Sequence, residues 1–459
     1  MDASYLLADN IARASMKDLP PEVVDVTKKC ILDTLGCILA GSGMSPDSKN
    51  VIDMFFDAGG SEEATVIGFN KKLPAWSAAF SNGVLAHSLD YDDIVDETGV
   101  HPSLCTIPAT LALAEKVGGV TGQEFITAIA LGNDLICRLG AAIRRKQDGM
   151  TFGFRPAPVL GIFGAAAAAG KVLKLSCDQI VDAIGIAFHQ GAAGTFEVFL
   201  SPGDPKIREL YGGSIGLQGV LAALMSQRGV TGIKTSFDGP AGLFSLYFQG
   251  KCDRDYLVGD LGTRFENVNA GLKPWSANRI MHAHVQAALE LTLESNINPS
   301  DIEQIILYVT DIQKRYAGDE RKKPSTSTEA RMSLPFCVGA AIANKGLSIR
   351  NFTADGLSDN LALRLAQKVV TADISYGEVT SSFPPGKVTI KLKSGATYTR
   401  QIDYPFGHPR NPMSPEDVVN KFKDCALHSR SRKEQAKIIR MINELETVRD
   451  IRMVTGSFR

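Results

Sequence analysis

The sequence has little of what marks a zinc-ribbon, thiol-redox or disulfide-stapled protein. Only eight cysteines occur among 459 residues, and no two of them form a C-x-x-C pair. That spacing argues against zinc ribbons and thioredoxin-like sites. Most of these cysteines lie in apolar stretches, where a thiol behaves as a small hydrophobic group. We therefore expect buried free thiols.

An excess of charge of either sign is also missing. Lys and Arg total 49 against 50 for Asp and Glu, so the net charge is −1. Such a chain has no global electrostatic reason to bind nucleic acid or an anionic membrane. The first residues lack a basic stretch followed by an apolar run, and no window approaches the roughly 18 apolar residues that span a bilayer. These absences predict a cytoplasmic protein with no nucleic-acid and no membrane partner.

Nucleotide-binding loops are absent as well. The segment FGAAAAAG at 163–170 resembles a P-loop but places five alanines between Gly164 and Gly170, and Val172 follows Lys171. A P-loop needs four residues between its glycines, and Ser or Thr after the lysine. No G-x-G-x-x-G follows a predicted strand. An apolar stretch of small residues instead predicts a central, buried helix.

Hydrophobic periodicity divides the chain into two kinds of structure. Apolar residues recur at helical spacing over 22–40, which Gly41 is expected to end, and over 74–89, 103–117, 122–143, 159–173, 177–189 and 214–228. Near residue 270 the pattern changes: 302–309 predicts a strand, 388–393 with 397–402 predicts a hairpin, and 280–293 and 329–343 predict helices. We predict a mainly α fold, with a large all-helical domain of 1–268 and 405–459 and a smaller α+β domain of 269–404.

The segment HSLDYDDIVDETGVHPS, residues 87–103, gathers titratable groups. It holds two histidines and five carboxylates: His87, His101, Asp90, Asp92, Asp93, Asp96 and Glu97. Histidine and carboxylate can bind a metal, but no H-x-x-x-H or facial-triad spacing is clear, so no metal is predicted. A solvated acidic loop is the plainer alternative. We favour a catalytic loop in which a carboxylate tunes the pKa of a histidine for general acid–base work.

Residues that could bind an anion gather in three further places. The segment GLKPWSANRIMHAH, 271–284, carries Lys273, Arg279, His282 and His284, a combination typical of an anion pocket. Arg155 lies in TFGFRPAPV, after a glycine-containing turn. Lys206, Arg208 and Tyr211 lie in DPKIRELYGGSIG, before a glycine-rich helix start, and helix N-termini favour anions. Each motif alone could equally consist of ordinary surface residues.

Together and in this order, these motifs resemble the MmgE/PrpD family, whose members include 2-methylcitrate dehydratase, cis-aconitate decarboxylase and iminodisuccinate epimerase. Residues 87–93 and 101–103 match the family's H-x-[LM]-D-[FY]-D-D and H-P-S, and KPWSANRIMH matches K-P-[YW]-x-x-x-R-x-x-H. STEARMSLPFCVGAAI from Ser327 and GHPRNPMSPEDVVNKF from Gly407 are similar to two later family segments. The resemblance covers essentially the whole chain.

The resemblance implies a helical main domain, an α+β lid domain and a site in the cleft between them. It also implies a homodimer and no required cofactor. Asp90, His101, Lys273 and His282 fall on or beside the family's active-site motifs, and Tyr316 lies near an expected tyrosine.

The chain departs from the family pattern at four positions. Arg155 stands where a histidine is usual, Arg208 where a lysine is usual and Tyr211 where a histidine is usual, while Ile94 replaces a common threonine. A guanidinium does not deprotonate near neutral pH. Arg155 therefore cannot shuttle protons, although it can still bind a carboxylate.

The resulting prediction is a cofactor-independent hydro-lyase of the dehydratase type, acting on a small hydroxy di- or tricarboxylate such as a citrate-like acid. Its predicted catalytic residues are Asp90, His101 and His282, with Asp90 orienting His101. Its predicted substrate-binding residues are Arg155, Arg208, Lys273, Lys206 and Tyr316. Two alternatives stay open: a decarboxylase of a cis-aconitate-like acid or an epimerase, and a catalytically idle paralogue that only binds a carboxylate.

Overall fold

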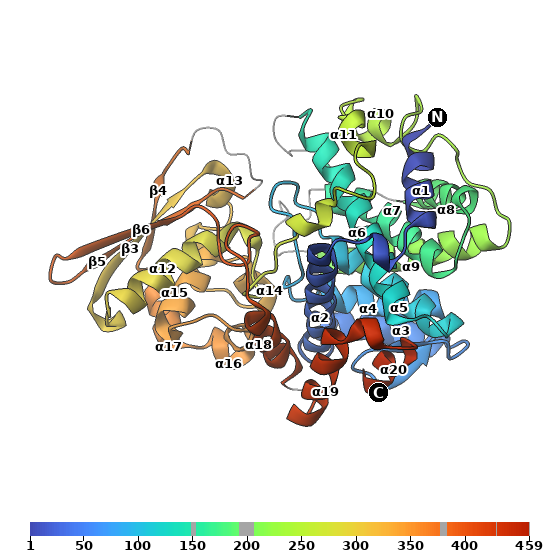
Figure 1. Cartoon of the computed structure of the whole chain (residues 1–459). Coiled ribbons are helices and arrows are strands. Elements are labelled where there is room, and N and C mark those ends of the chain that lie inside the picture. Colours follow the sequence, from blue (N-terminus) through green and yellow to red (C-terminus); the bar gives the residue numbers. More distant parts are fainter. Residues whose placement is uncertain (148–152, 192–205, 377–382, 428, 459) are drawn as a thin grey trace.

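Two hydrophobic cores organise the protein, which a computed structural model describes for residues 1–147, 153–191, 206–376, 383–427 and 429–458 (Figure 1). The larger core takes its residues from Ala3 to Leu272 and again from Met413 to Phe458. The smaller one runs from Trp275 to Ile390. The domain boundaries proposed at 268/269 and 404/405 stay a prediction. A third, small cluster lies around Cys37 and Tyr91.

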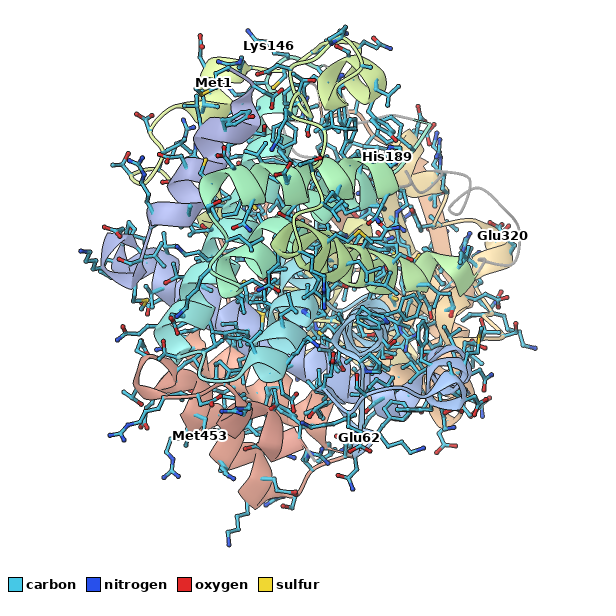
Figure 2. All side chains as sticks on the ribbon, turned by 90° about the vertical axis from the view of Figure 1, so that its right-hand side faces the viewer. Met1, Glu62, Lys146, His189, Glu320 and Met453 are labelled. Carbon is cyan, nitrogen blue, oxygen red and sulfur yellow. The ribbon has the colours of Figure 1, made fainter. Side chains whose placement is uncertain are left out.

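The larger unit is a bundle of helices, and side chains fill the space between them (Figure 2). Its helices are α1 (Ala3–Arg13), α2 (Pro21–Met44), α3 (Pro46–Ala58), α4 (Ala75–His87), α5 (Pro102–Val117), α6 (Gly122–Arg144), α7 (Pro156–Val172), α8 (Cys177–Gln190), α9 (Tyr211–Gln227), α10 (Leu243–Phe248) and α11 (Arg254–Val258). The alanine-rich α7 is buried and packs against α5, α6, α8 and α9. The prediction of a buried central helix is confirmed.

Gly41 does not end its helix, contrary to the prediction, because α2 continues to Met44. A Cβ on Gly41 would lie 2.4 Å from the carbonyl oxygen of Leu85 on α4. The glycine therefore permits the close approach of α2 and α4 rather than stopping the helix.

A two-stranded hairpin interrupts the predicted all-helical domain, while the mainly α fold class is confirmed. Strands β1 (Ala64–Val66) and β2 (Lys71–Leu73) pair antiparallel. Thr65 binds the carboxylate of Glu115 on α5 through its backbone N–H at 2.7 Å and its hydroxyl at 2.8 Å. This short element lacks the alternating pattern that would have predicted strands.

Helix α6 is long and apolar enough to cross a membrane by length and composition, although the sequence was expected to contain no such window. However, 94% of that stretch is buried inside the protein. It packs as a core helix between α5 and α7. The expected free thiols are present: all eight cysteines are unpaired, and only Cys177 and Cys252 are not fully buried.

The smaller unit is a four-stranded sheet covered by helices. Strands β3 (Ile302–Val309), β4 (Val369–Asp373), β5 (Gly386–Leu392) and β6 (Thr397–Ile402) lie in the order β4-β3-β5-β6, with β3 and β4 parallel and the other neighbours antiparallel. The helices are α12 (His282–Glu294), α13 (Asp311–Lys314), α14 (Ser327–Arg331), α15 (Leu334–Asn344), α16 (Ala354–Leu357) and α17 (Asn360–Gln367). The predicted helix 329–343 is two helices, because Ser333 caps a new N-terminus at which Pro335 can sit.

The C-terminal tail returns to the helical unit, as predicted. Its helices are α18 (Pro415–Ala426), α19 (Arg432–Asn443) and α20 (Arg452–Thr455). Helix α18 packs on α2, and its buried Lys421 forms an ion pair with Asp33 of α2 at 2.6 Å. The same ammonium donates to the carbonyl oxygen of Tyr91 at 2.6 Å. The tail thus holds the backbone of the 88–101 loop.

Candidate active site

The acidic loop predicted to carry the chemistry joins α4 to α5 and is folded tightly on itself. Its backbone bridges Val95 to Val100 and Ile94 to Gly271. Asp90 adopts a left-handed backbone conformation with φ of 49°. This conformation is uncommon for a residue other than glycine, and it reverses the chain just after α4. The loop is thereby buried rather than a solvated acidic surface.

One carboxylate in this loop holds two histidines. Asp92 accepts hydrogen bonds from Nδ1 of His87 at 2.8 Å and from Nδ1 of His101 at 2.7 Å. Asp92 is fully buried, and both imidazoles are less than one-tenth exposed. The predicted orienting residue for His101, Asp90, is therefore corrected to Asp92. Asp90 points elsewhere because its carboxylate binds Lys273 at 2.6 Å.

The electrostatics of this group define its protonation. Burial raises the pKa of Asp92, but the charges of His87, Lys273 and His101 outweigh burial and hold it well below its usual value. Burial lowers the pKa of His101 in spite of Asp92. At neutral pH His101 is therefore a neutral imidazole whose Nδ1 donates to an ionised carboxylate. Its Nε2 carries a lone pair and can accept a proton.

His87, Asp92 and His101 are also the one group among the described residues that could hold a metal ion, with ligand atoms within 4.8 Å of one another. The nitrogen–oxygen distances of 2.7 and 2.8 Å are those of charge-assisted hydrogen bonds. The three side chains are thus held together without an ion between them.

Lys273 brings the smaller unit into the same cluster. Its buried ammonium donates to the Asp90 carboxylate at 2.6 Å and lies 3.8 Å from Asp92. Burial lowers the pKa of Lys273, but the negative charges of Asp90 and Asp92 raise it by a larger amount, so the lysine stays charged. The predicted residue Lys273 therefore reaches the loop, although Asp90 already takes up one of its hydrogen bonds.

Arg155, Arg208 and Tyr211 meet beside the histidines. The central guanidinium carbon of Arg155 lies 4.2 Å from the ring centre of Tyr211, and the Tyr211 ring lies 4.6 Å from that of His87 and 6.4 Å from that of His101. Arg155 also lies 3.5 Å from the carbonyl oxygen of Arg208, which belongs to the short helix η3 (Lys206–Leu210). Both arginines are buried.

Tyr211 was not among the predicted site residues, yet it lies in this cluster. It is 8% exposed, and its hydroxyl has no hydrogen-bond partner in the described part of the chain. Burial raises the phenol pKa well above its ordinary value, so the hydroxyl stays protonated and can donate. The signal that could have identified it was its place at a position where the family usually has histidine.

The structure gives less information on two of the predicted binding residues, Tyr316 and Lys206. Burial raises the pKa of Tyr316, which also responds to the charges of Arg208 and Asp90, so this tyrosine lies within electrostatic range of the cluster. The backbone of Lys206 belongs to η3, but its side chain lies outside the described residues.

His282, predicted as the catalytic counterpart of His101, has hydrogen-bonding neighbours at both ring nitrogens. Its Nε2 lies 3.0 Å from the carbonyl oxygen of Ala277, and its Nδ1 lies 3.5 Å from Arg279. Burial, followed by the charge of Arg279, holds its pKa well below the usual value. His282 is thus a neutral side chain packed into the smaller unit, and its catalytic role stays a prediction.

A buried ion pair fastens the smaller unit to the loop. Arg279, in η5 (Arg279–Met281), donates to both carboxylate oxygens of Asp96 at 2.7 to 3.1 Å and to the carbonyl oxygen of Phe406 at 3.0 Å. Together with the Lys273–Asp90 pair, this contact places the cluster between the two cores.

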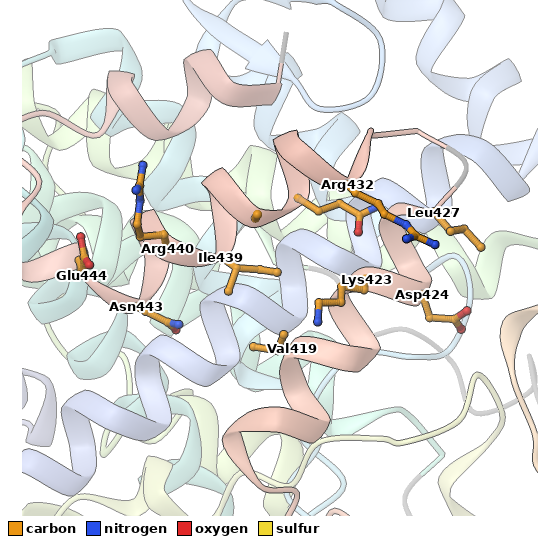
Figure 3. A pocket seen from close by; sticks show the side chains of 11 residues that line it. Val419, Lys423, Asp424, Leu427, Arg432, Ile439, Arg440, Asn443 and Glu444 are labelled. Atoms are coloured by element: carbon orange, nitrogen blue, oxygen red, sulfur yellow. The ribbon is translucent and has the colours of Figure 1, made fainter.

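A cavity of about 740 Å³ lies elsewhere, between α18 and α19 (Figure 3). Val419, Leu427 and Ile439 line it together with charged residues such as Lys423 and Arg440. None of the residues of the histidine cluster contributes to it. This cavity therefore lies apart from the histidine cluster.

Comparison with known proteins gives a consistent assignment. Residues 6–254 match the MmgE/PrpD N-terminal domain, and residues 275–447 match the MmgE/PrpD C-terminal domain. The cis-aconitate decarboxylase of Mus musculus is 27% identical over 456 residues, which cover 94% of this chain and 88% of that protein. The human enzyme is 27% identical over 451 residues, covering 95% and 90%. That of Aspergillus terreus is 24% identical over 453 residues, covering 95% and 91%. Because the two family domains account for most of its length, the chain belongs to the MmgE/PrpD family.

Proposed function

We propose that this protein is a lyase that acts on a small polycarboxylate by acid–base catalysis, with His101 as the group that transfers the proton. The observation that carries the proposal is the buried pair of His101 and ionised Asp92, set among the cations Lys273 and Arg155. A histidine held in one tautomer by a carboxylate is suited to proton transfer. Cations around it favour a substrate rich in carboxylates.

Decarboxylation of a cis-aconitate-like acid is the first reaction to test, because the relatives described above carry the name cis-aconitate decarboxylase. In this reaction a carbon–carboxylate bond breaks, carbon dioxide leaves, and the electron pair moves through the alkene to a carbon that takes up a proton. His101 would first take up a proton from water at Nε2, where the negative charges of a bound polycarboxylate and of Asp92 favour the imidazolium, and would then deliver that proton to the carbon. Tyr211 would donate its hydroxyl hydrogen to a substrate carboxylate.

Dehydration of a hydroxy acid is the second candidate, and His87 favours it. Removing water requires one group to take the α-proton and another to protonate the leaving hydroxyl. The carboxylate of Asp92 presents two imidazoles, His87 and His101, that could divide these roles. The cations would stabilise the negative charge that develops on the substrate carboxylate.

Product analysis distinguishes these reactions. Purified protein is incubated with cis-aconitate, citrate and 2-methylcitrate, and carbon dioxide release is measured alongside formation of a new alkene. We expect carbon dioxide from cis-aconitate and its loss in His101→Gln. Formation of an alkene from citrate or 2-methylcitrate, without release of carbon dioxide, would instead support dehydration. Tight binding without turnover of any of the three acids would contradict both reactions and favour an idle carboxylate-binding protein.

A further inference from the structure

We propose that Arg331 is a further substrate-binding residue, which with Arg208 forms a carboxylate subsite on the smaller-unit side of the cluster. The inference rests on the proposed function only in taking the ligand to be a polycarboxylate. It deepens that proposal by requiring at least two carboxylates on the ligand.

Arg331 is a buried cation with an unused donor. It is the last residue of α14 and is 3% exposed. Its Nε donates to the hydroxyl of Ser276 at 3.0 Å, and its central carbon lies 5.5 Å from the ring centre of Phe352. Its Nη2 has no hydrogen-bond partner, and the guanidinium forms no ion pair with a carboxylate, across the residues that the structure describes.

Several other buried cations of this protein have a carboxylate partner. Arg138 pairs with Asp134 at 2.7 Å, and Lys421 pairs with Asp33 at 2.6 Å. A buried charge without such a partner is unfavourable, because it has lost its hydration shell and no directly paired opposite charge replaces it. A guanidinium stays charged in proteins, so Arg331 cannot relieve this by losing its proton. An anionic ligand can.

The position of Arg331 directs that ligand to the histidine cluster. Ser276, which accepts from Arg331, donates its own hydroxyl to the carbonyl oxygen of Leu89 at 2.6 Å, one residue before Asp90. Burial lowers the pKa of Arg331 to about 10, and its charge responds to Glu209, Asp90 and Arg208. The acid Glu209 accepts a hydrogen bond from Thr328 at 3.1 Å. Arg331 and Arg208 therefore add two positive charges next to Asp90, with Arg331 reaching the loop from the smaller unit and Arg208 from η3.

The geometry of a guanidinium specifies the chemistry of its ligand. A free edge of N–H groups matches a carboxylate better than a hydroxyl or an amide. Because Lys273 is already paired with Asp90, a ligand held by Arg155 near the histidines needs a second carboxylate to reach Arg331. A di- or tricarboxylate satisfies this requirement and a monocarboxylate does not.

Binding of unreactive probes tests the subsite without depending on turnover. Titration calorimetry compares tricarballylate, glutarate and butyrate on the wild type, Arg331→Gln and Arg331→Lys. The exposed Arg350 of the same unit supplies the matched control, Arg350→Gln. We expect Arg331→Gln to weaken tricarballylate binding at least tenfold, Arg331→Lys to weaken it less, and Arg350→Gln to leave it unchanged. Without ligand, the Tm of Arg331→Gln should equal or exceed that of the wild type, since an unpaired buried charge has been removed.

The outcomes separate this inference from the proposed function. Loss of tricarballylate binding in Arg331→Gln supports the subsite even if the wild type turns over none of the three acids. Turnover by the wild type with unchanged tricarballylate affinity in Arg331→Gln would support the function and overturn the subsite. A fall in the ligand-free Tm of Arg331→Gln, with equal loss for every probe, would assign Arg331 a structural role. Failure of the wild type to bind tricarballylate or glutarate would also overturn it.

Discussion

The guanidinium of Arg155 lies over the ring of Tyr211, with its central carbon 4.2 Å from the ring centre. Both positions depart from the histidines that the family usually carries there. The two substituted side chains stabilise each other, since a cation over an aromatic face is attracted by the charge distribution of the ring. The pair replaces two groups that can titrate near neutral pH with a permanent cation and a protonated phenol.

Tyr211→Phe should separate the hydroxyl from the ring. The variant keeps the surface under Arg155 and removes a donor that has no partner within the described residues. Stability should therefore stay close to that of the wild type, while kcat/KM on the identified substrate falls by about 10- to 100-fold, as for loss of a hydrogen bond to a charged group. Unchanged kinetics together with an unchanged Tm would mean that the hydroxyl never meets the substrate.

Asp92→Asn should disable His101 without removing it. The amide cannot supply the negative charge that holds the Nδ1–H tautomer or stabilises an imidazolium. We expect kcat to fall by roughly 10²- to 10⁴-fold, similar to the fall in His101→Gln. Steady-state kinetics of both variants and of the double variant test this, because residues acting as a unit give non-additive losses. Full activity of Asp92→Asn would refute the pairing as the catalytic device.

Asp93→Asn should alter the pH dependence of stability. Burial raises the pKa of Asp93 to about 7 from its ordinary value of 3.8, although its carboxylate accepts from the backbone N–H of Ser103. Since the folded pKa lies above the unfolded one, this group's contribution is present at low pH and is lost as the pH rises through 7. Between about pH 4 and 7 the loss amounts to roughly 1 kcal/mol per pH unit.

Urea unfolding at pH 5 to 8 measures this effect. The free energy of unfolding of Asp93→Asn should fall less steeply with pH than that of the wild type. Substitution of the exposed Asp178 by asparagine is the control and should preserve the wild-type slope. Parallel curves for the wild type and Asp93→Asn would show that Asp93 ionises normally.

The Arg279–Asp96 pair should be a strong tie between the two units. Both side chains are buried, and their shortest contact is 2.7 Å. Removing one partner leaves the other charge buried and unpaired, so Arg279→Met or Asp96→Asn should destabilise the protein by about 3–5 kcal/mol. The double variant should lose less than the sum of the two, which chemical denaturation of all four proteins measures. Additive losses would mean that the two charges do not depend on each other.

Local patterns in the sequence were enough to predict the fold class. The helical spacing in α5 and α6 and the β-branched run of β3 predicted these elements to within a residue or two. Strand β4 was missed because its burial does not alternate regularly and because its partners on β3 lie 64 residues away in sequence, as in the pair of Ile305 with Val369. Local propensity carries no information about such a partner.

The sequence by itself also determined which segments carry the chemistry, because titratable groups gathered within a few residues must share a small space. Only the tertiary structure decided which of them pair. The left-handed turn at Asp90 sends that carboxylate to Lys273, 183 residues away, and leaves Asp92 to hold His101. Arg331 became a candidate for the same reason. That it is buried, with its Nη2 lacking a partner among the described residues, follows from how two distant units pack, which sequence spacing does not encode.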